Sequence, residues 1–173
     1  MPYAITLRLD DTAAATVTGM WRTLAAAGVS DECLALGYPP HMTLAIFAEG
    51  ADEAVLAAAA RIAAARWRSR PVSLASVGLF PGTPATLFLA PVADADLLAA
   101  HADLLAETGQ QGLDPHYRVR CWVPHVTLAS DLTEPAAAVA ALGSVTLPLM
   151  GRLVAMEVVR FRPVMILTRA ILA

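Results

Sequence analysis

The residues with the clearest chemical potential form two short segments of nearly identical sequence. Pro40-His41-Met42-Thr43-Leu44-Ala45 matches Pro124-His125-Val126-Thr127-Leu128-Ala129 at five of six positions, and the two histidines lie 84 residues apart, close to half the chain. Such a match is rare by chance even in a sequence rich in alanine and leucine, so it predicts an internal duplication. Two copies of one unit commonly pack about a pseudo-twofold axis, which would bring the segments face to face across a shared groove.

Within each segment, the histidine and the threonine two positions later are expected to share one face of a strand. His41 then projects together with Thr43, and His125 together with Thr127. The apolar residues between and after them point to the opposite face, into the core. The groove would therefore hold two imidazoles and two hydroxyl groups.

This set of groups suits in-line displacement at phosphorus. Because histidine has an unperturbed pKa of about 6.5, one imidazole can be neutral and the other protonated near neutral pH. The neutral ring would deprotonate the attacking oxygen, and the protonated ring would protonate the leaving oxygen. The threonine hydroxyls would donate hydrogen bonds to phosphoryl oxygens as their charge builds. No metal and no other cofactor is required, and the roles of the two histidines depend on which way round the substrate lies.

The elements expected to carry these residues follow the order β-α-β-α-β twice, and two strands are added at the end. Asp10, Asp52 and Asp94 offer N-cap oxygens for three of the helices, and Gly28 is placed to end the first. Strands are expected at residues 3–9, 42–47, 71–79, 85–92, 122–129, 145–149, 154–161 and 164–172, and helices at about 10–27, 52–68 and 94–109, with a short one opening at 133–135.

The length of 173 residues predicts a single domain. The repeats are expected to cover about residues 1–80 and 84–150, with closing strands in 152–173. Alanine raises the mean hydropathy to +0.58. The longest uncharged stretch, 71–93, contains four prolines and cannot be one membrane-spanning helix.

The charge and the cysteine content limit the cellular compartments and the classes of ligand that we expect. No secretory signal is visible at the N-terminus, and Cys33 and Cys121 stand alone, which fits a reduced cytoplasm and excludes a disulfide scaffold or a thiolate zinc site. The formal net charge is −3, and all twelve basic residues are arginines. This balance disfavours long duplex nucleic acid and leaves a small or short anionic ligand open.

With two His-x-Thr segments at this spacing, the chain resembles the 2H phosphoesterase superfamily, the group of 2′-5′ RNA ligases and cyclic phosphodiesterases. The family pattern maps onto His41 and Thr43, and onto His125 and Thr127, without departure, and the connector at 78–82 also fits. The resemblance implies a two-lobed α+β fold whose duplicated β-α-β-α-β units place antiparallel sheets around a central cleft. It also implies metal-independent chemistry on 2′,3′-cyclic phosphates or 2′-5′ phosphodiesters of RNA ends or nucleotides, catalysed by these four residues.

Four neighbouring residues are candidates for substrate binding. Tyr38 and Trp122 each lie three positions before a motif histidine and could stack on a nucleobase, or could instead cap the ends of the sheet. Arg118 and Arg120 precede the second motif and could contact phosphate with two hydrogen bonds each, or could lie on a solvated loop.

The expected partner is a nucleotide or a short RNA with a cyclic phosphate, and three alternatives stay open. The substrate could be a small cyclic phosphate unrelated to RNA, or the cleft could bind nucleotides or RNA ends without turnover. A metal hydrolase with His41 and His125 as ligands is the third, although no carboxylate lies beside either motif. His101, on a helix, and His116, in a loop, lack the threonine partner and are expected at the surface.

Overall fold

The computed structural model describes residues 1–173, which form one antiparallel seven-stranded sheet and its covering helices. The α+β class predicted from the sequence is therefore confirmed. The strands are β1 (Tyr3–Leu9), β2 (His41–Phe47), β3 (Arg70–Phe80), β4 (Ala85–Pro91), β5 (Val126–Leu132), β6 (Leu149–Arg160) and β7 (Met165–Ile171). The helices are α1 (Asp11–Ala26), α2 (Glu32–Ala35), α3 (Glu53–Arg66), α4 (Ala95–Glu107) and α5 (Pro135–Ala141), with a 3-10 turn at Pro115–Tyr117.

Aspartates start the three longest helices, as the sequence predicts. The side chains of Asp10, Asp52 and Asp94 accept hydrogen bonds from backbone N–H groups in the first turns of α1, α3 and α4. Gly28 follows the C-cap of α1 with a φ of 68°, a conformation that glycine adopts without strain. None of the helices is both long and apolar enough to cross a membrane.

The two halves of the chain exchange strands. The sheet order is β1-β2-β5-β4-β3-β6-β7, and β1 also pairs with β6. Strand β6 therefore has three neighbours: residues 149–153 pair with β3, and residues 153–160 pair with β1 and, over most of their length, with β7. As a result, β1 and β2 of the first half are completed by β6 from the second, and β4 and β5 of the second half are completed by β3 from the first.

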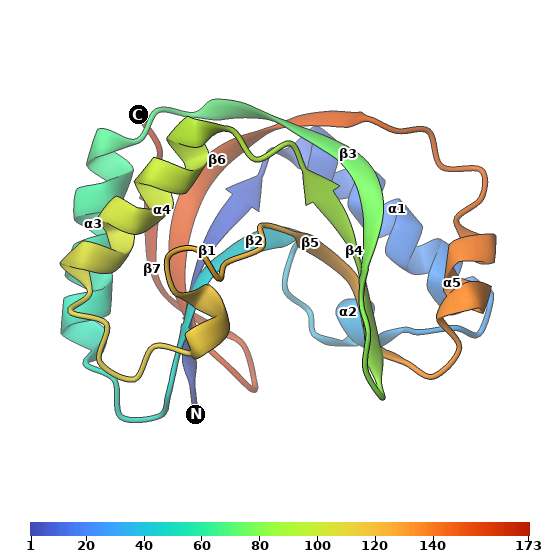
Figure 1. Ribbon diagram of the computed structural model, residues 1–173, viewed down its shortest axis with the longest axis horizontal. Coiled ribbons are helices and arrows are strands. Elements are labelled where there is room, and N and C mark those ends of the chain that lie inside the picture. The colour runs from blue at the N-terminus through green and yellow to red at the C-terminus, as the bar shows by residue number, and fades with distance from the viewer.

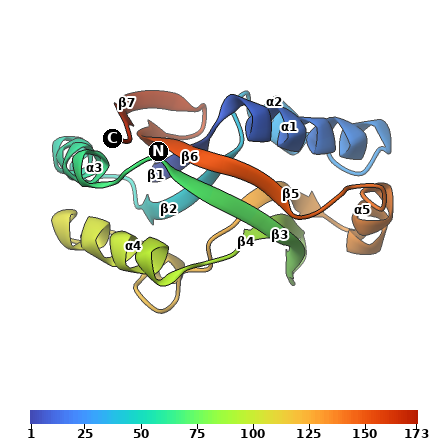
Figure 2. The same ribbon diagram turned by 90° about the horizontal axis from the view of Figure 1, so that it is seen from above.

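The helices lie toward the two ends of the curved sheet. Figure 1 shows α3 and α4 together at one end and α1 with α5 toward the other, and Figure 2 shows the same division from above. Helix α1 buries Val17, Trp21 and Leu24. One cluster of buried apolar residues extends through both halves of the chain, from Ile5 on β1 to Leu128 on β5.

Three predicted strands differ from the structure by more than one residue at an end, and two of them contain a proline. The strand expected at 154–161 begins five residues earlier, at Leu149. The strand expected at 145–149 does not form, and pairing begins only at Leu149, directly after Pro148. The strand expected at 122–129 begins at Val126, two residues after Pro124. Proline has no N–H to donate to a neighbouring strand, so each ladder starts beyond it. Helix α2 and the 3-10 turn carry no apolar periodicity and were not anticipated.

Gly151 marks the point where β6 passes closely over α1. A Cβ atom there would lie 2.5 Å from the Cβ of Ala13. We expect Gly151→Ala to lower the free energy of unfolding by about 1–3 kcal/mol, because strand and helix would be forced apart. Gly19, inside α1, is the matched control. A Cβ there meets nothing within 4 Å, so Gly19→Ala should raise stability by up to about 1 kcal/mol.

Urea denaturation of the two variants measures both effects. A Gly151→Ala protein as stable as the wild type would show that α1 moves outward without cost.

Candidate active site

The two histidine–threonine segments meet at a single pair of residues. Met42 on β2 pairs with Val126 on β5, and these strands make no other pairing. Both residues are fully buried, so the side chains on either side of them point to the opposite face. There, one cavity of about 200 Å³, which we call the central cavity, is lined by all four predicted catalytic residues: His41, Thr43, His125 and Thr127.

Both imidazoles are oriented in the same way. Nδ1 of His41 lies 2.9 Å from the carbonyl oxygen of Pro39, and Nδ1 of His125 lies 2.8 Å from that of Val123. A carbonyl oxygen only accepts hydrogen bonds, so Nδ1 carries the proton in each ring and the neutral form has its lone pair on Nε2. Each histidine thus offers Nε2 as the atom that takes or gives a proton.

Tryptophans tie each motif threonine to the other half of the chain. Nε1 of Trp21, on α1, donates to the carbonyl oxygen of Thr127 at 3.0 Å, and Nε1 of Trp122 donates to that of Thr43 at 2.9 Å. The two threonine hydroxyls have no hydrogen-bond partner in the protein, and both residues line the central cavity. Their hydroxyl protons are therefore available to a ligand.

Burial lowers the pKa of both histidines. For His41 it outweighs the opposing hydrogen bond to Pro39, and with the positive charge of Arg8 nearby it brings the pKa to about 4. Burial also holds the pKa of His125 below its ordinary value. Both rings are therefore mainly neutral at pH 7 in the free protein, whereas the unperturbed pKa suggested one neutral and one protonated ring.

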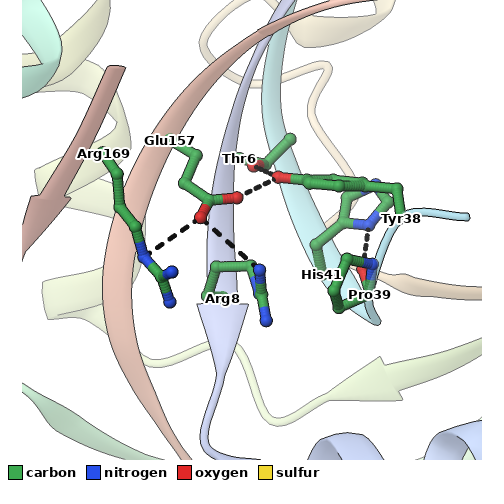
Figure 3. A network of polar contacts seen from close by, with 7 residues as sticks. All are labelled: Thr6, Arg8, Tyr38, Pro39, His41, Glu157 and Arg169. Carbon is green, nitrogen blue, oxygen red and sulfur yellow. Dashed lines mark hydrogen bonds and ion pairs between the residues drawn. The ribbon is translucent and has the colours of Figure 1, made fainter. Parts of the chain in front are cut away.

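A buried carboxylate lies behind His41 (Figure 3). Glu157 on β6 is fully buried, and Tyr38 donates its hydroxyl to Glu157 Oε2 at 2.5 Å. Oε1 of Glu157 faces Nη1 of Arg8 at 3.4 Å and Nε of Arg169 at 3.2 Å. The two guanidinium groups and the tyrosine hydroxyl satisfy a charge that would otherwise be very unfavourable to bury.

Tyr38 connects this network to the site. Its hydroxyl also lies 2.7 Å from Oγ1 of Thr6, which fixes the ring at one end. The ring centre lies 4.6 Å from that of His41, at an interplanar angle of 52°. His41 therefore packs against an aromatic wall that the sheet itself holds in place.

His125 has different neighbours. Its ring lies 5.1 Å from the ring of Phe80, edge to face, and 5.3 Å from that of Phe88. Gly78, opposite Phe88 in the β3–β4 ladder, leaves the space that the Phe88 ring fills. The surroundings of the second histidine are thus aromatic, without the buried charges found behind His41.

Two further cavities adjoin the central one, each beside one histidine. The large side cavity, about 450 Å³, includes His125 and is also lined by Phe80, Tyr117 and Trp122. The small side cavity, about 130 Å³, includes His41 and is also lined by the polar residues Glu32, Ser130 and Arg162. No group of three or more histidine, cysteine or carboxylate side chains is placed to hold a metal ion.

This architecture and sequence match a known family. The family model of the 2′-5′ RNA ligase superfamily matches residues 10–162. The chain belongs to this superfamily. Sequence comparison with curated proteins gives no match.

Solved structures share the fold of this 2′-5′ RNA ligase superfamily member. The protein TT0787 of Thermus thermophilus aligns with a TM-score of 0.69 at 18% identity, over 99% of this chain and 98% of its own. E. coli LigT in complex with 3′-AMP aligns with a TM-score of 0.62 at 16% identity, over 99% and 96%. Usb1 of Kluyveromyces marxianus aligns with a TM-score of 0.50 at 14% identity, over 96% and 97%.

The four candidate binding residues fall in different places within this superfamily fold. Trp122 lines the large side cavity while its ring stacks on His101 at 4.1 Å. Tyr38 is 4% exposed and borders the central cavity with its hydroxyl turned to the sheet. Arg118 and Arg120 are exposed and line none of the three cavities. The structure thus brings the two aromatic residues to the site and leaves the two arginines outside it.

The prediction for one of the remaining histidines was wrong. His101 is only 2% exposed, because its ring fills the space beneath Trp122 and its Nε2 lies 3.0 Å from the carbonyl oxygen of Leu44. His101, on α4, therefore supports β2, the strand that carries the first motif. His116 is exposed as predicted and pairs with Asp114.

Several residues of the site were not anticipated from the sequence. The residues that line the cavities without having been anticipated are Phe80, Tyr117, Arg162 and Trp21, and Glu157 supports Tyr38 from behind. None of them lies within a repeated motif. Only the charge of Arg8 beside His41 could have been predicted, because the register of β1 against β2 pairs these two residues once the strands are known to be antiparallel.

The lowered pKa of His41 predicts acid sensitivity. Between about pH 6.5 and 4 the unfolded chain binds a proton at this residue that the folded protein does not, so the free energy of unfolding falls as the pH is lowered through this window. His41→Gln should make this dependence shallower. Denaturant titrations of both proteins at several pH values measure the difference; parallel curves would mean that His41 protonates equally in both states.

Proposed function

We propose that the protein is a metal-independent phosphodiesterase that acts on 2′,3′-cyclic phosphates or 2′-5′ phosphodiesters of RNA ends or nucleotides. One observation carries the proposal. Around a single cavity, two imidazoles have Nδ1 fixed and Nε2 free, and two threonine hydroxyls have no protein partner. An acid, a base and two donors for phosphoryl oxygens are the groups that displacement at phosphorus needs.

The ligands of a structural relative support this substrate class. E. coli LigT, which shares the fold, has been crystallised with 3′-AMP and with phosphate. A nucleotide with a phosphate at the ribose 2′ or 3′ position is the expected product when a 2′,3′-cyclic phosphate is opened by water.

The two side cavities favour one orientation of the substrate. The large side cavity, at about 450 Å³, has the size of a small-molecule site and aromatic walls suited to a nucleoside. The small side cavity, at about 130 Å³, has the polar side chains of Glu32, Ser130 and Arg162 in its wall and room for a few waters. With the nucleoside beside His125, the leaving ribose oxygen faces His125, and the attacking water comes from the side of His41.

The proposed step is the hydrolysis of one phosphorus–oxygen bond. Nε2 of His41 takes a proton from water while the water oxygen forms a bond to phosphorus. The bond between phosphorus and one ribose oxygen breaks, and Nε2 of His125, protonated in the substrate complex, gives its proton to that oxygen. The hydroxyls of Thr43 and Thr127 donate to the non-bridging oxygens. The phosphodiester anion between the rings favours protonation of His125, which offsets its low pKa in the free protein.

Turnover of a 2′,3′-cyclic mononucleotide in excess EDTA is the direct test. We expect one phosphomonoester product, identified by ³¹P NMR, at a rate unchanged by the chelator. Loss of activity in EDTA that added metal restores would replace the proposal with a metal hydrolase. Tight binding without turnover would replace it with a nucleotide-binding role.

Each histidine should be needed for the rate but not for folding. We expect His41→Ala and His125→Ala to lower kcat by about 10²–10⁴-fold, the usual contribution of a general acid or base. Circular dichroism should be unchanged, because both side chains border a cavity. A variant within tenfold of the wild-type rate would remove that histidine from the mechanism.

A further inference from the structure

The central cavity has a single formally charged side chain in its wall. Of the fourteen residues that line it, only Arg162 carries a permanent charge. Arg162 also lines the small side cavity, together with His41 and Thr127. It comes from the turn between β6 and β7, remote in sequence from both motifs.

Arg162 is held in place but has unused donors. Its Nη2 donates to Oε1 of Glu32 at 2.7 Å, and this is its only hydrogen bond in the protein. Oε2 of Glu32 accepts from the backbone N–H of Ser130 at 3.3 Å and from the Ser130 hydroxyl. The carboxylate is thus fixed at both oxygens, and Nε and Nη1 of Arg162 stay free. The guanidinium itself is largely solvent-accessible, with a side-chain exposure of 66%.

The turn that carries Arg162 is anchored on both sides. Phe161 and Val164 pack against a small buried cluster formed by Ala4, Tyr38 and Val159. Tyr38 belongs to the wall behind His41. The backbone on either side of Arg162 is therefore attached to the same support as the first catalytic histidine.

The chemistry leaves a charge to be balanced. A phosphodiester enters with one negative charge, and attack by an activated water places further negative charge on the non-bridging oxygens. The two threonine hydroxyls are neutral donors. Arg8, the other nearby cation, is paired with the buried Glu157 and does not line the central cavity. Arg162 is the one permanent cation in the wall, and it keeps its positive charge after His125 has given its proton to the leaving oxygen.

We infer that Arg162 is a catalytic residue that donates from its guanidinium to a non-bridging oxygen of the scissile phosphate, while Glu32 holds it in position. This role rests on the proposed function and adds to it a residue outside both repeated motifs. A planar guanidinium suits the task, because it can make two parallel hydrogen bonds to phosphoryl oxygens.

The test compares Arg162→Gln and Arg162→Lys with a control, Arg68→Gln. Arg68 is exposed just beyond α3 and lines none of the cavities. We expect Arg162→Gln to lower kcat by about 10²–10³-fold, as for the loss of one oxyanion donor. Arg162→Lys should fall between, because it keeps the charge and loses the paired donors. Arg68→Gln should match the wild type in both turnover and stability.

Binding of inorganic phosphate, followed by calorimetry or ³¹P NMR, gives a readout that does not need turnover. Arg162→Gln should weaken it by about tenfold or more, the effect of one hydrogen bond to a charged group. If the wild type binds phosphate through Arg162 but opens no cyclic phosphate, the proposed function fails while the anion contact stands. If the wild type turns over and Arg162→Gln equals Arg68→Gln in rate and phosphate affinity, Arg162 is only a partner of Glu32 and the inference is overturned.

Discussion

The site depends on one contact, the pairing of Met42 with Val126. Because β2 and β5 touch only there, the motif residues on both sides of this pair gather around one point. A slip of either strand by one residue would turn its histidine and threonine into the core. The register is fixed by the neighbouring strands, since β2 pairs with β1 along most of its length and β5 pairs with β4. The indole hydrogen bonds from Trp21 and Trp122 add a second restraint, because each crosses to the motif of the other half.

Each half of the chain gives one strand, β3 or β6, to the strands of the other half. This exchange explains how β2 and β5 can lie edge to edge although they pair at only one pair of residues. Strand β6 spans twelve residues and pairs with β3 at its start and with β1 further on. The two halves are thus joined along this crossing, at some distance from the motifs. The strands β2 and β5 can then diverge on either side of Met42 and Val126 and leave room for a cavity. The close passage of Gly151 over α1 is a consequence of this long, shared strand.

Local sequence signals predicted much of this structure, and the limits of the prediction are physical. The repeated segments, the aspartate caps and the alternation in the strands depend on residues close together in the chain, and the helix starts at Asp10, Asp52 and Asp94 follow from them. The strand exchange does not follow from such local signals, because it is a choice between strand partners far apart in the chain.

The same distinction holds for the site. His41 and His125 could be predicted because they recur in the two repeated segments, whereas Glu157 and Arg162 have no equivalent in a repeated motif. Arg118 and Arg120 were chosen for their nearness in sequence, yet the turn before β5 leaves them at the surface. His101 was misjudged for a related reason, since its burial depends on the ring of Trp122 above it, which comes from another part of the chain.

The repeated motif gives both histidines the same hydrogen bond and the same neighbouring hydroxyl, so any difference between them must come from outside the motifs. His41 packs on Tyr38, which the buried Glu157 and its two arginines hold rigid, and it faces a small polar cavity. His125 packs against two phenyl rings, which also pack on each other, and it faces a large aromatic cavity. In the reaction that we propose, an acid and a base act on opposite sides of a phosphorus atom, and a symmetric site would not distinguish water from nucleoside. The unrepeated residues around the motifs therefore supply the asymmetry that this reaction needs, because they give two equivalent imidazoles different surroundings.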